Sequence, residues 1–341
     1  MALPTGTAGV FAPVNIAGAL FNKTDVRTPL FNMLGGVAVG SREFLTGAEY
    51  SLGSASQPEI SETASLTAPT PSFTERTQGT NVTQIFQRAV SVTYRKSSNT
   101  DALTGLNLAG QNNNVPSELS FQLGNRLAEI RNDMEYTILN GEYNKATTAD
   151  EADKTRGIIE AITSNTVAAG GAELDPEMLI EIARQLSEAS PYGLQGVVGI
   201  LNAEQIVQLN KIVTNEGQRT VTTMDAAGSN LLGYRTPFGT LNFMEGGHRY
   251  APNGTAVFAN LGIMKNVLQP VPGKGNFFYE ALAKTGAAES GQIYGQWGLD
   301  HGHEWMHAKI TGLATTTTKQ TAPKVFISNG SDAPLYTVAS V

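Results

Sequence analysis

The sequence predicts an α+β fold with more than one lobe, and three observations lead to this prediction. The chain has 341 residues, which is more than one compact core usually absorbs. A long amphipathic helical pattern lies between stretches with the alternating pattern of strands, and residues 155–265 mix short helical and strand patterns. Residues 41–80 form a long irregular segment for which a compact single domain has little use.

Composition narrows the class of function. Lys and Arg number 23 and Asp and Glu 30, which gives a net charge of −7. A protein that reads nucleic-acid sequence normally carries a basic face, so this class is disfavoured. The chain has no cysteine, which excludes disulfides and thiolate metal sites. Charged residues make up only 16% of the chain, below the usual proportion of about a quarter, and this suits a protein that covers its surface with copies of itself.

Residues 1–40 predict an extended arm. They are rich in Gly, Ala, Thr and Pro and hold no sustained period, apart from a short helix expected at 16–21. No charge precedes Lys23 and two prolines interrupt the segment before it, so we expect no secretion signal. Nowhere does the sequence hold about 18 uninterrupted apolar residues, so we expect no membrane span.

Residues 41–98 predict a long β-excursion that leaves the body of the protein and returns to it. Its outward half, 41–80, contains three prolines and no period of its own. The return, NVTQIFQRAVSVTYRKS at 81–97, alternates with the period of a strand. One face of this strand carries Phe86, Arg88, Val90, Val92 and Tyr94.

The strongest helical signal spans residues 117–141. One apolar stripe runs along it at steps of three or four residues, and Asn140 followed by Gly141 ends it. The stripe consists of Leu119, Leu123, Leu127, Ile130, Met134 and Ile138. A helix of this length is roughly 35 Å long and predicts a scaffold element. We expect its solvent face to carry the charged residues Glu129, Arg131, Asp133 and Glu135.

Residues 155–265 predict a separate α/β lobe. Asp175 and Pro176 begin one helix, and Asn202 begins a second helix at 203–213. Strands are expected at 196–201, 236–247 and 255–264.

The strands that follow this lobe are joined by Gly-rich turns. A run of threonines then separates a C-terminal tail, residues 314–341.

Residues 303–307 read His-Glu-Trp-Met-His, a complete H-E-x-x-H motif. On a helix, this spacing places two imidazoles on one face beside a carboxylate, as in zinc peptidases. Residues 305–310 alternate like a strand instead, on which His303 and His307 would lie roughly 13 Å apart. No His or Glu follows His307 to supply a third ligand. The zinc peptidase with Glu304 as general base stays an alternative, and we assign no catalytic, cofactor-binding or metal-binding residue.

Four stretches together resemble the major capsid proteins of tailed bacteriophages, which have the Hong Kong-type shell fold. They are NVTQIFQRAVSVTYRKS at 81–97, LAEIRNDMEYTILNG at 127–141, LAKTGAAESGQIYGQWGL at 282–299 and LDHGHEWMHAKITGL at 299–313. Members of this family carry a similar final stretch in which Asn is common where His303 stands. The resemblance therefore implies that one exchange created the H-E-x-x-H in a shell protein.

The resemblance implies the tailed-phage capsid fold. Residues 1–40 would be its N-terminal arm, 41–98 its E-loop and 155–265 its axial A-domain. Residues 99–154 and 266–313, which include the long helix, would form its peripheral P-domain. It also implies a structural subunit rather than an enzyme. Hexamers and pentamers of this subunit would form an icosahedral or elongated shell around double-stranded DNA.

The implied partners are other copies of the chain, a portal protein, and scaffolding and decoration proteins. Contact with packaged DNA would be weak and independent of sequence, and no membrane or cofactor is implied. The implied location is the virion, after assembly in the cytoplasm of a bacterial host. A trimeric fibre or adhesin module is the other alternative, which the abundance of Thr, Gly and Asn suggests, although we find no internal repeat.

Overall fold

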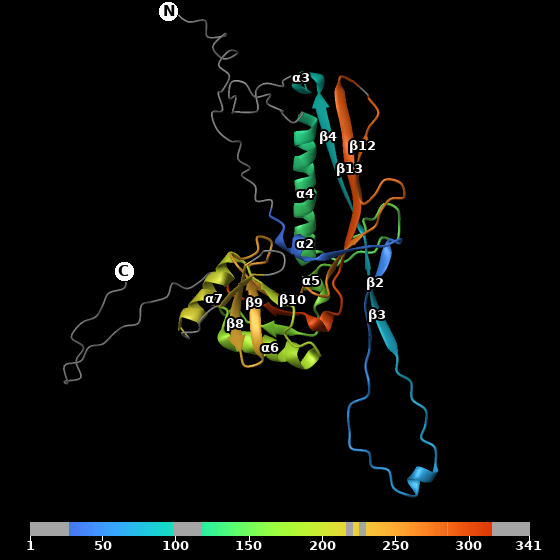
Figure 1. Cartoon of the computed structure of the whole chain (residues 1–341), viewed down its shortest axis with the longest axis vertical. Helices are drawn as coiled ribbons and strands as arrows, with labels where there is room; N and C mark the ends of the chain where they lie inside the picture. Colours follow the sequence, from blue (N-terminus) through green and yellow to red (C-terminus); the bar gives the residue numbers. More distant parts are fainter. Residues whose placement is uncertain (1–26, 98–117, 216–220, 225–229, 285, 316–341) are drawn as a thin grey trace, which may run out of the picture.

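A computed structural model of the chain describes residues 27–97, 118–215, 221–224, 230–284 and 286–315. Within these ranges the chain forms two main β-sheets, a long helix and a projecting hairpin (Figure 1). The short helix expected at 16–21 and the tail beyond residue 315 lie outside the described residues. Among the described helices, none is both long enough and apolar enough to cross a membrane.

The first sheet is built around one long strand, β13 (Ala288–Asp300). Along one edge β13 pairs antiparallel with β4 (Gln84–Thr93), which confirms the strand predicted within 81–97 and places it in the body of the protein. Its other edge pairs with two shorter strands that follow one another along β13. They are β12 (Phe277–Ala281), opposite residues 291–295, and β11 (Lys265–Leu268), opposite residues 297–300. The short strand β1 (Gly35–Ala38) adds in parallel to β11. A single turn of helix, α3 (Tyr94–Ser97), follows β4.

The predicted long helix is α4 (Glu118–Asn140), and it packs along β4 and β13 (Figure 1). The end of its apolar stripe is buried in the core at Ile130, Met134 and Ile138. The beginning of the stripe is not covered to the same extent, because Leu127 is 41% exposed. The prediction for Glu135 is wrong: this carboxylate is fully buried. It lies on the flank of the helix that faces the preceding part of the chain.

Residues expected to belong to the arm enter the body. The short helix α2 (Pro29–Met33) packs against α4, and β1 joins the first sheet. The physical reason is burial of apolar side chains, since Leu30 is fully buried and Leu34 nearly so.

The second sheet has seven strands and two covering helices. Its strand order is β5 (Thr166–Ala168), β14 (Ala308–Thr311), β10 (Thr255–Asn260), β6 (Val197–Ile200), β9 (Gly239–Met244), β8 (Asn230–Thr236) and β7 (Val221–Met224). Helix α6 (Pro176–Ala189) begins at Asp175, whose side chain accepts a hydrogen bond from the backbone N–H of Glu177. Helix α7 (Ala203–Asn215) begins at Asn202, which exchanges hydrogen bonds with Gln205. Both predicted helix starts are therefore confirmed.

The strand β14 lies in this second sheet and not with the peripheral strands that precede it in the sequence. It pairs antiparallel with β10 and parallel with β5. Its side chains Ala308 and Ile310 are fully buried in the core of the second sheet. The two sheets also share a core, because one apolar cluster joins Ile138 and Trp297 to Val257.

The excursion is a projecting hairpin, but it is shorter than predicted. Strand β4, the predicted return, belongs to the first sheet, because Phe86, Val90 and Val92 are buried there. Strand β2 (Glu43–Tyr50) runs outward and β3 (Arg76–Val82) returns antiparallel to it, with one irregularity in register between Thr46 and Ala48. Between them lies an extended loop that contains only the short 3₁₀ turn η1 (Ala64–Leu66). Figure 1 shows this loop reaching well beyond the rest of the molecule.

Two glycines of β13 make room for aromatic rings of the neighbouring strand. A Cβ added at Gly295 would lie 2.3 Å from the ring of Phe277, and one added at Gly291 would lie 2.3 Å from Tyr279. The rings therefore lie flat across the glycines and take the place of their missing side chains.

We expect Gly295→Ala to lower the free energy of unfolding by about 1–3 kcal/mol, because the ring of Phe277 has to leave its position. Urea denaturation of the unassembled protein, followed by circular dichroism, measures this difference. Gly36→Ala in β1 is the matched control, since a Cβ there meets nothing within 4 Å. Equal unfolding curves for the two variants would contradict the packing role of Gly295.

Candidate functional site

The H-E-x-x-H motif lies on a turn between the two sheets. Residues Glu304–Met306 form a 3₁₀ turn, η2, and β14 begins only at Ala308. The strand expected from residue 305 onward is therefore wrong for its first three residues. Within this turn the backbone N–H of His307 donates to the carbonyl of Glu304, a contact that an extended strand does not make.

His307 is fully buried and both of its ring nitrogens are engaged. Nδ1 accepts a hydrogen bond of 3.0 Å from the backbone N–H of Asn260. Nε2 must then carry the proton, which it donates to the carbonyl oxygen of His301 at 2.7 Å. The one lone pair that could bind a metal is therefore occupied. Burial lowers the pKa of His307 to about 4.

Glu304 is also engaged by the protein. Its carboxylate accepts hydrogen bonds from the backbone N–H and the hydroxyl of both Thr163 and Ser164, at 2.6–3.1 Å. Burial by itself would raise the pKa of Glu304, but these hydrogen bonds outweigh it and hold the pKa below its usual value. Glu304 thus ties the turn to the loop between α5 (Ile158–Ala161) and β5. Both of its carboxylate oxygens already accept hydrogen bonds from the protein.

The remaining histidines of the motif region do not complete a metal site. His303 lies beside Glu49, with 3.7 Å between Nδ1 and the carboxylate oxygen. His301 is buried without a hydrogen-bond partner for either ring nitrogen among the described residues. Burial, followed by the nearby charge of Arg156, lowers its pKa. Within the part of the chain that the structure describes, no three His, Asp or Glu side chains converge as metal ligands do. The geometry does not support a zinc peptidase.

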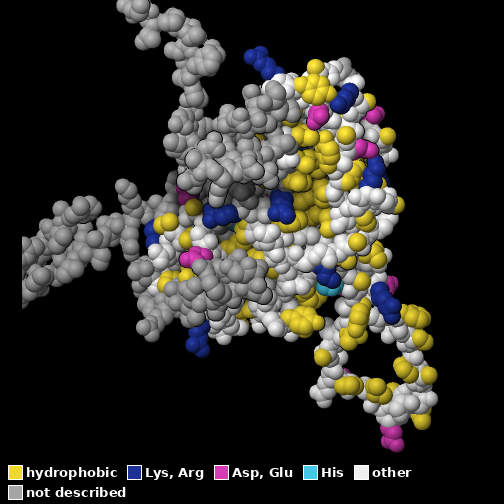
Figure 2. Space-filling model, turned by 45° about the horizontal axis from the view of Figure 1, so that its top comes forward, with side chains coloured by type: hydrophobic (Ala, Val, Ile, Leu, Met, Phe, Trp, Pro, Cys, Tyr) yellow, Lys and Arg dark blue, Asp and Glu magenta, His cyan; other side chains and the backbone are white. Residues whose placement is uncertain are grey.

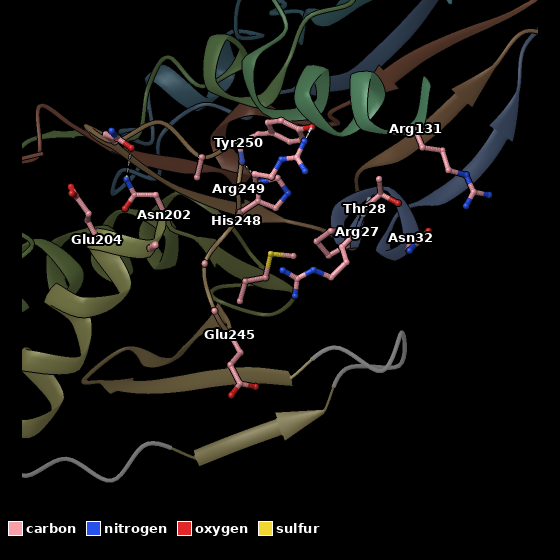
Figure 3. Close-up of a pocket in the computed structure, with 17 residues that line it drawn as sticks. Arg27, Thr28, Asn32, Arg131, Asn202, Glu204, Glu245, His248, Arg249 and Tyr250 are labelled. Carbon is pink, nitrogen blue, oxygen red and sulfur yellow. Dashed lines mark hydrogen bonds between the residues drawn. The ribbon is translucent and has the colours of Figure 1, made fainter. Parts of the chain in front are cut away.

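A second candidate is an open groove of about 1040 Å³ between the helices α2 and α4 and the second lobe (Figure 3). Its lining includes Arg27 next to α2, Arg131 on α4, and Glu204 and Glu245 on the second lobe. Figure 3 shows these charged side chains on different sides of the opening. Because charges of both signs are spread around it, we assign no ligand to this groove.

The buried Glu135 lies beside this groove, and sequence reasoning missed its role. One carboxylate oxygen accepts from the backbone N–H of Leu30 and the other from that of Phe31, each at 2.8 Å. His248 Nε2 lies 2.8 Å from the first oxygen, and His248 Nδ1 accepts from the backbone N–H of Tyr250. The arrangement joins α2, α4 and the segment before β10. It leaves no free group for chemistry.

The excursion presents the most unusual surface of the protein. Several of its large apolar side chains are 58–91% exposed, although such groups are normally covered. They are Leu45, Tyr50, Leu52, Ile60, Leu66 and Phe73. Figure 2 shows hydrophobic side chains distributed all along this loop. A surface of this kind is typical of a site where another molecule binds.

The sequence profile of the SU10 major capsid protein family matches residues 3–314. The chain belongs to the SU10 major capsid protein family. Its function is accordingly to form a capsid shell, which is a structural role. No curated protein matches the chain significantly.

Solved structures confirm the fold of this capsid protein. An encapsulin, the holo-SrpI complex of Synechococcus elongatus, has 14% sequence identity and a TM-score of 0.60, over 94% of this chain and 99% of that one. A structure from Mycobacterium phage Patience has 11% sequence identity and a TM-score of 0.54, over 93% of this chain and 88% of that one. The capsid structure of Cyanophage P-SCSP1u has 10% sequence identity and a TM-score of 0.53, over 92% of this chain and 96% of that one. These findings support neither the peptidase nor the fibre alternative.

The depressed pKa of His307 predicts that acid destabilises the capsid protein. Its imidazole stays neutral in the folded state, whereas the unfolded chain takes up a proton below about pH 6.5. The stability that His307 contributes is therefore complete above pH 6.5 and is lost as the pH falls toward 4. We expect a loss of roughly 3 kcal/mol in the free energy of unfolding over this range.

Urea denaturation of the unassembled protein at several pH values measures this loss. We expect His307→Gln to be less stable than the wild type at pH 7, by about 1–3 kcal/mol, and to depend less on pH. His303→Gln serves as the control and keeps the dependence of the wild type. If His307→Gln kept it too, the assignment to His307 would be wrong.

Proposed function

We propose that this capsid protein assembles into hexamers and pentamers, and that the loop at residues 51–75 of each copy lies on a neighbouring copy. The observation that carries the proposal is the exposure of the loop's apolar side chains. Leu52, Ile60, Leu66 and Phe73 have nothing to cover them in the described part of a single protomer. Burying one such side chain contributes about 1.5–3 kcal/mol of favourable free energy. Binding of the loop to a neighbouring copy would therefore stabilise the assembly.

The two sheets have different roles in this proposal. The lobe of residues 155–265, completed by β14, lies toward the centre of each hexamer or pentamer. The lobe with α4 and the first sheet lies at the rim, and the β2–β3 hairpin with its loop, residues 43–82, extends from it. The division of one protomer into two sheets with their own covering helices supports this arrangement.

The assembled shell, icosahedral or elongated, encloses double-stranded DNA in this proposal. The net charge of −7 favours weak contact with DNA that does not depend on sequence. A portal protein, scaffolding and decoration proteins are the further proposed partners. Assembly takes place in the cytoplasm of a bacterial host, and the subunit acts without catalysis.

Electron microscopy and sedimentation of the purified chain test this function. We expect the wild type to form shells, tubes or capsomer rings. We expect the double variant Leu66→Ser with Phe73→Ser to lose at least tenfold in assembled particles, because both side chains lose their apolar contact with the neighbour. Its free energy of unfolding should change by less than about 0.5 kcal/mol, since both positions are exposed in the protomer.

Ser56→Ala, an exposed change in the same loop, is the control and should assemble like the wild type. A wild-type chain that stays a monodisperse monomer under all conditions would contradict the proposed assembly. Normal assembly of the double variant would contradict only the role of the loop.

A further inference from the structure

The base of the excursion rests directly on the turn that holds the H-E-x-x-H motif. At the irregularity in β2, Gly47 has a φ of +50°, which favours glycine. A Cβ added there would lie 2.9 Å from the carbonyl oxygen of Gly302 and 3.0 Å from Nδ1 of His303. The backbone of β2 therefore touches the turn at a point where no side chain fits.

Two residues further along β2, Glu49 makes a second contact with the same turn. Its carboxylate accepts a hydrogen bond of 2.6 Å from the indole N–H of Trp305. The ring of His303 lies against the ring of Trp305, with 5.1 Å between the centroids, and its Nδ1 faces the same carboxylate. Both rings thus present one surface to Glu49.

The turn is a rigid support for these contacts. Glu304 fixes it to the loop before β5 through four hydrogen bonds, and His307 fixes it to Asn260, the last residue of β10. Glu304 and His307 bind the body of the protein. They hold in place His303 and Trp305, which contact β2.

The hairpin is anchored at a second level, closer to the body. Asn81 of β3 is fully buried, donates to the carbonyl of Leu299 and accepts from the backbone N–H of Arg156. Asn81 is paired with Phe44, five residues before Glu49 on β2. At about 3.3 Å per residue the two anchors lie roughly 16 Å apart along the strand. One anchor alone allows the hairpin to pivot, whereas two fix its direction.

We infer that Gly302, His303 and Trp305 form a latch that contacts Gly47 and Glu49 and sets the angle at which the β2–β3 hairpin leaves the body. The loop extends far beyond β2. A small rotation of the hairpin at Gly47 therefore moves the apolar side chains of the loop several times farther than it moves the base of the hairpin. The latch therefore determines where these side chains meet a neighbouring copy. This inference rests on the proposed role of the excursion, and its residues act by positioning.

Hydrogen–deuterium exchange of the unassembled protein tests the latch. Gly47→Ala forces β2 off the turn, and Trp305→Phe removes the N–H donor while keeping an aromatic ring. We expect exchange in residues 43–50 and 76–80 to rise three- to tenfold in both variants, while α4 keeps the exchange of the wild type. Gly53→Ala, where a Cβ meets nothing within 4 Å, is the matched control and should stay within twofold of the wild type.

The same variants are then assembled and imaged. We expect Gly47→Ala and Trp305→Phe to give at least fivefold fewer closed shells than Gly53→Ala. Unchanged exchange at 43–50 and 76–80 would overturn the latch, and so would a parallel rise in α4, which would assign these residues to general stability. Raised exchange with normal shells would also overturn it, because the angle would then not matter. Failure of the wild type to assemble would count against the proposed function instead, and the exchange measurement would still decide whether the latch exists.

Discussion

One buried carboxylate, that of Glu135, determines how the main parts of the subunit are joined. A charge without solvent is costly unless it is fully hydrogen-bonded, and removing one partner of such a group typically costs about 3–5 kcal/mol. Glu135 meets this requirement only when the first turn of α2 and the ring of His248 are both in place. The long helix, the N-terminal segment and the second lobe must therefore be correctly arranged together. The apolar cluster that both sheets share lies around this contact.

The sequence predicted the elements whose signals are local. The period of two in β4, the stripe of α4 and the helix starts at Asp175 and Asn202 all depend on residues within a few positions of one another. Local signals also predicted that the excursion leaves the body, because its composition suits no core. The resemblance to phage capsid proteins, carried by four short stretches, gave the family correctly.

The errors concern contacts between distant parts of the chain. Glu135 is an acidic residue among charged neighbours in the sequence. Contacts with α2, more than 100 residues earlier, and with His248, more than 100 residues later, make it a buried residue. The turn at 304–306 replaces the start of the predicted strand because Thr163 and Ser164, about 140 residues earlier, bind Glu304. The motif itself shows the same limit: its spacing matches a zinc site, but a zinc site needs free lone pairs. Whether they are free depends on residues that the motif does not contain.

The pairing of β4 with β13 has a consequence for synthesis of the chain. Val90 pairs with Gly291, so the first sheet cannot form until about 200 further residues have been made. At ~5–20 residues per second this takes roughly 10–40 s. During that time the apolar residues of the excursion have left the ribosome, while the body from which they project does not yet exist. Association of unfinished chains through these side chains during this interval would remove subunits before they fold. The rate of translation therefore affects how many folded subunits are available to build a shell.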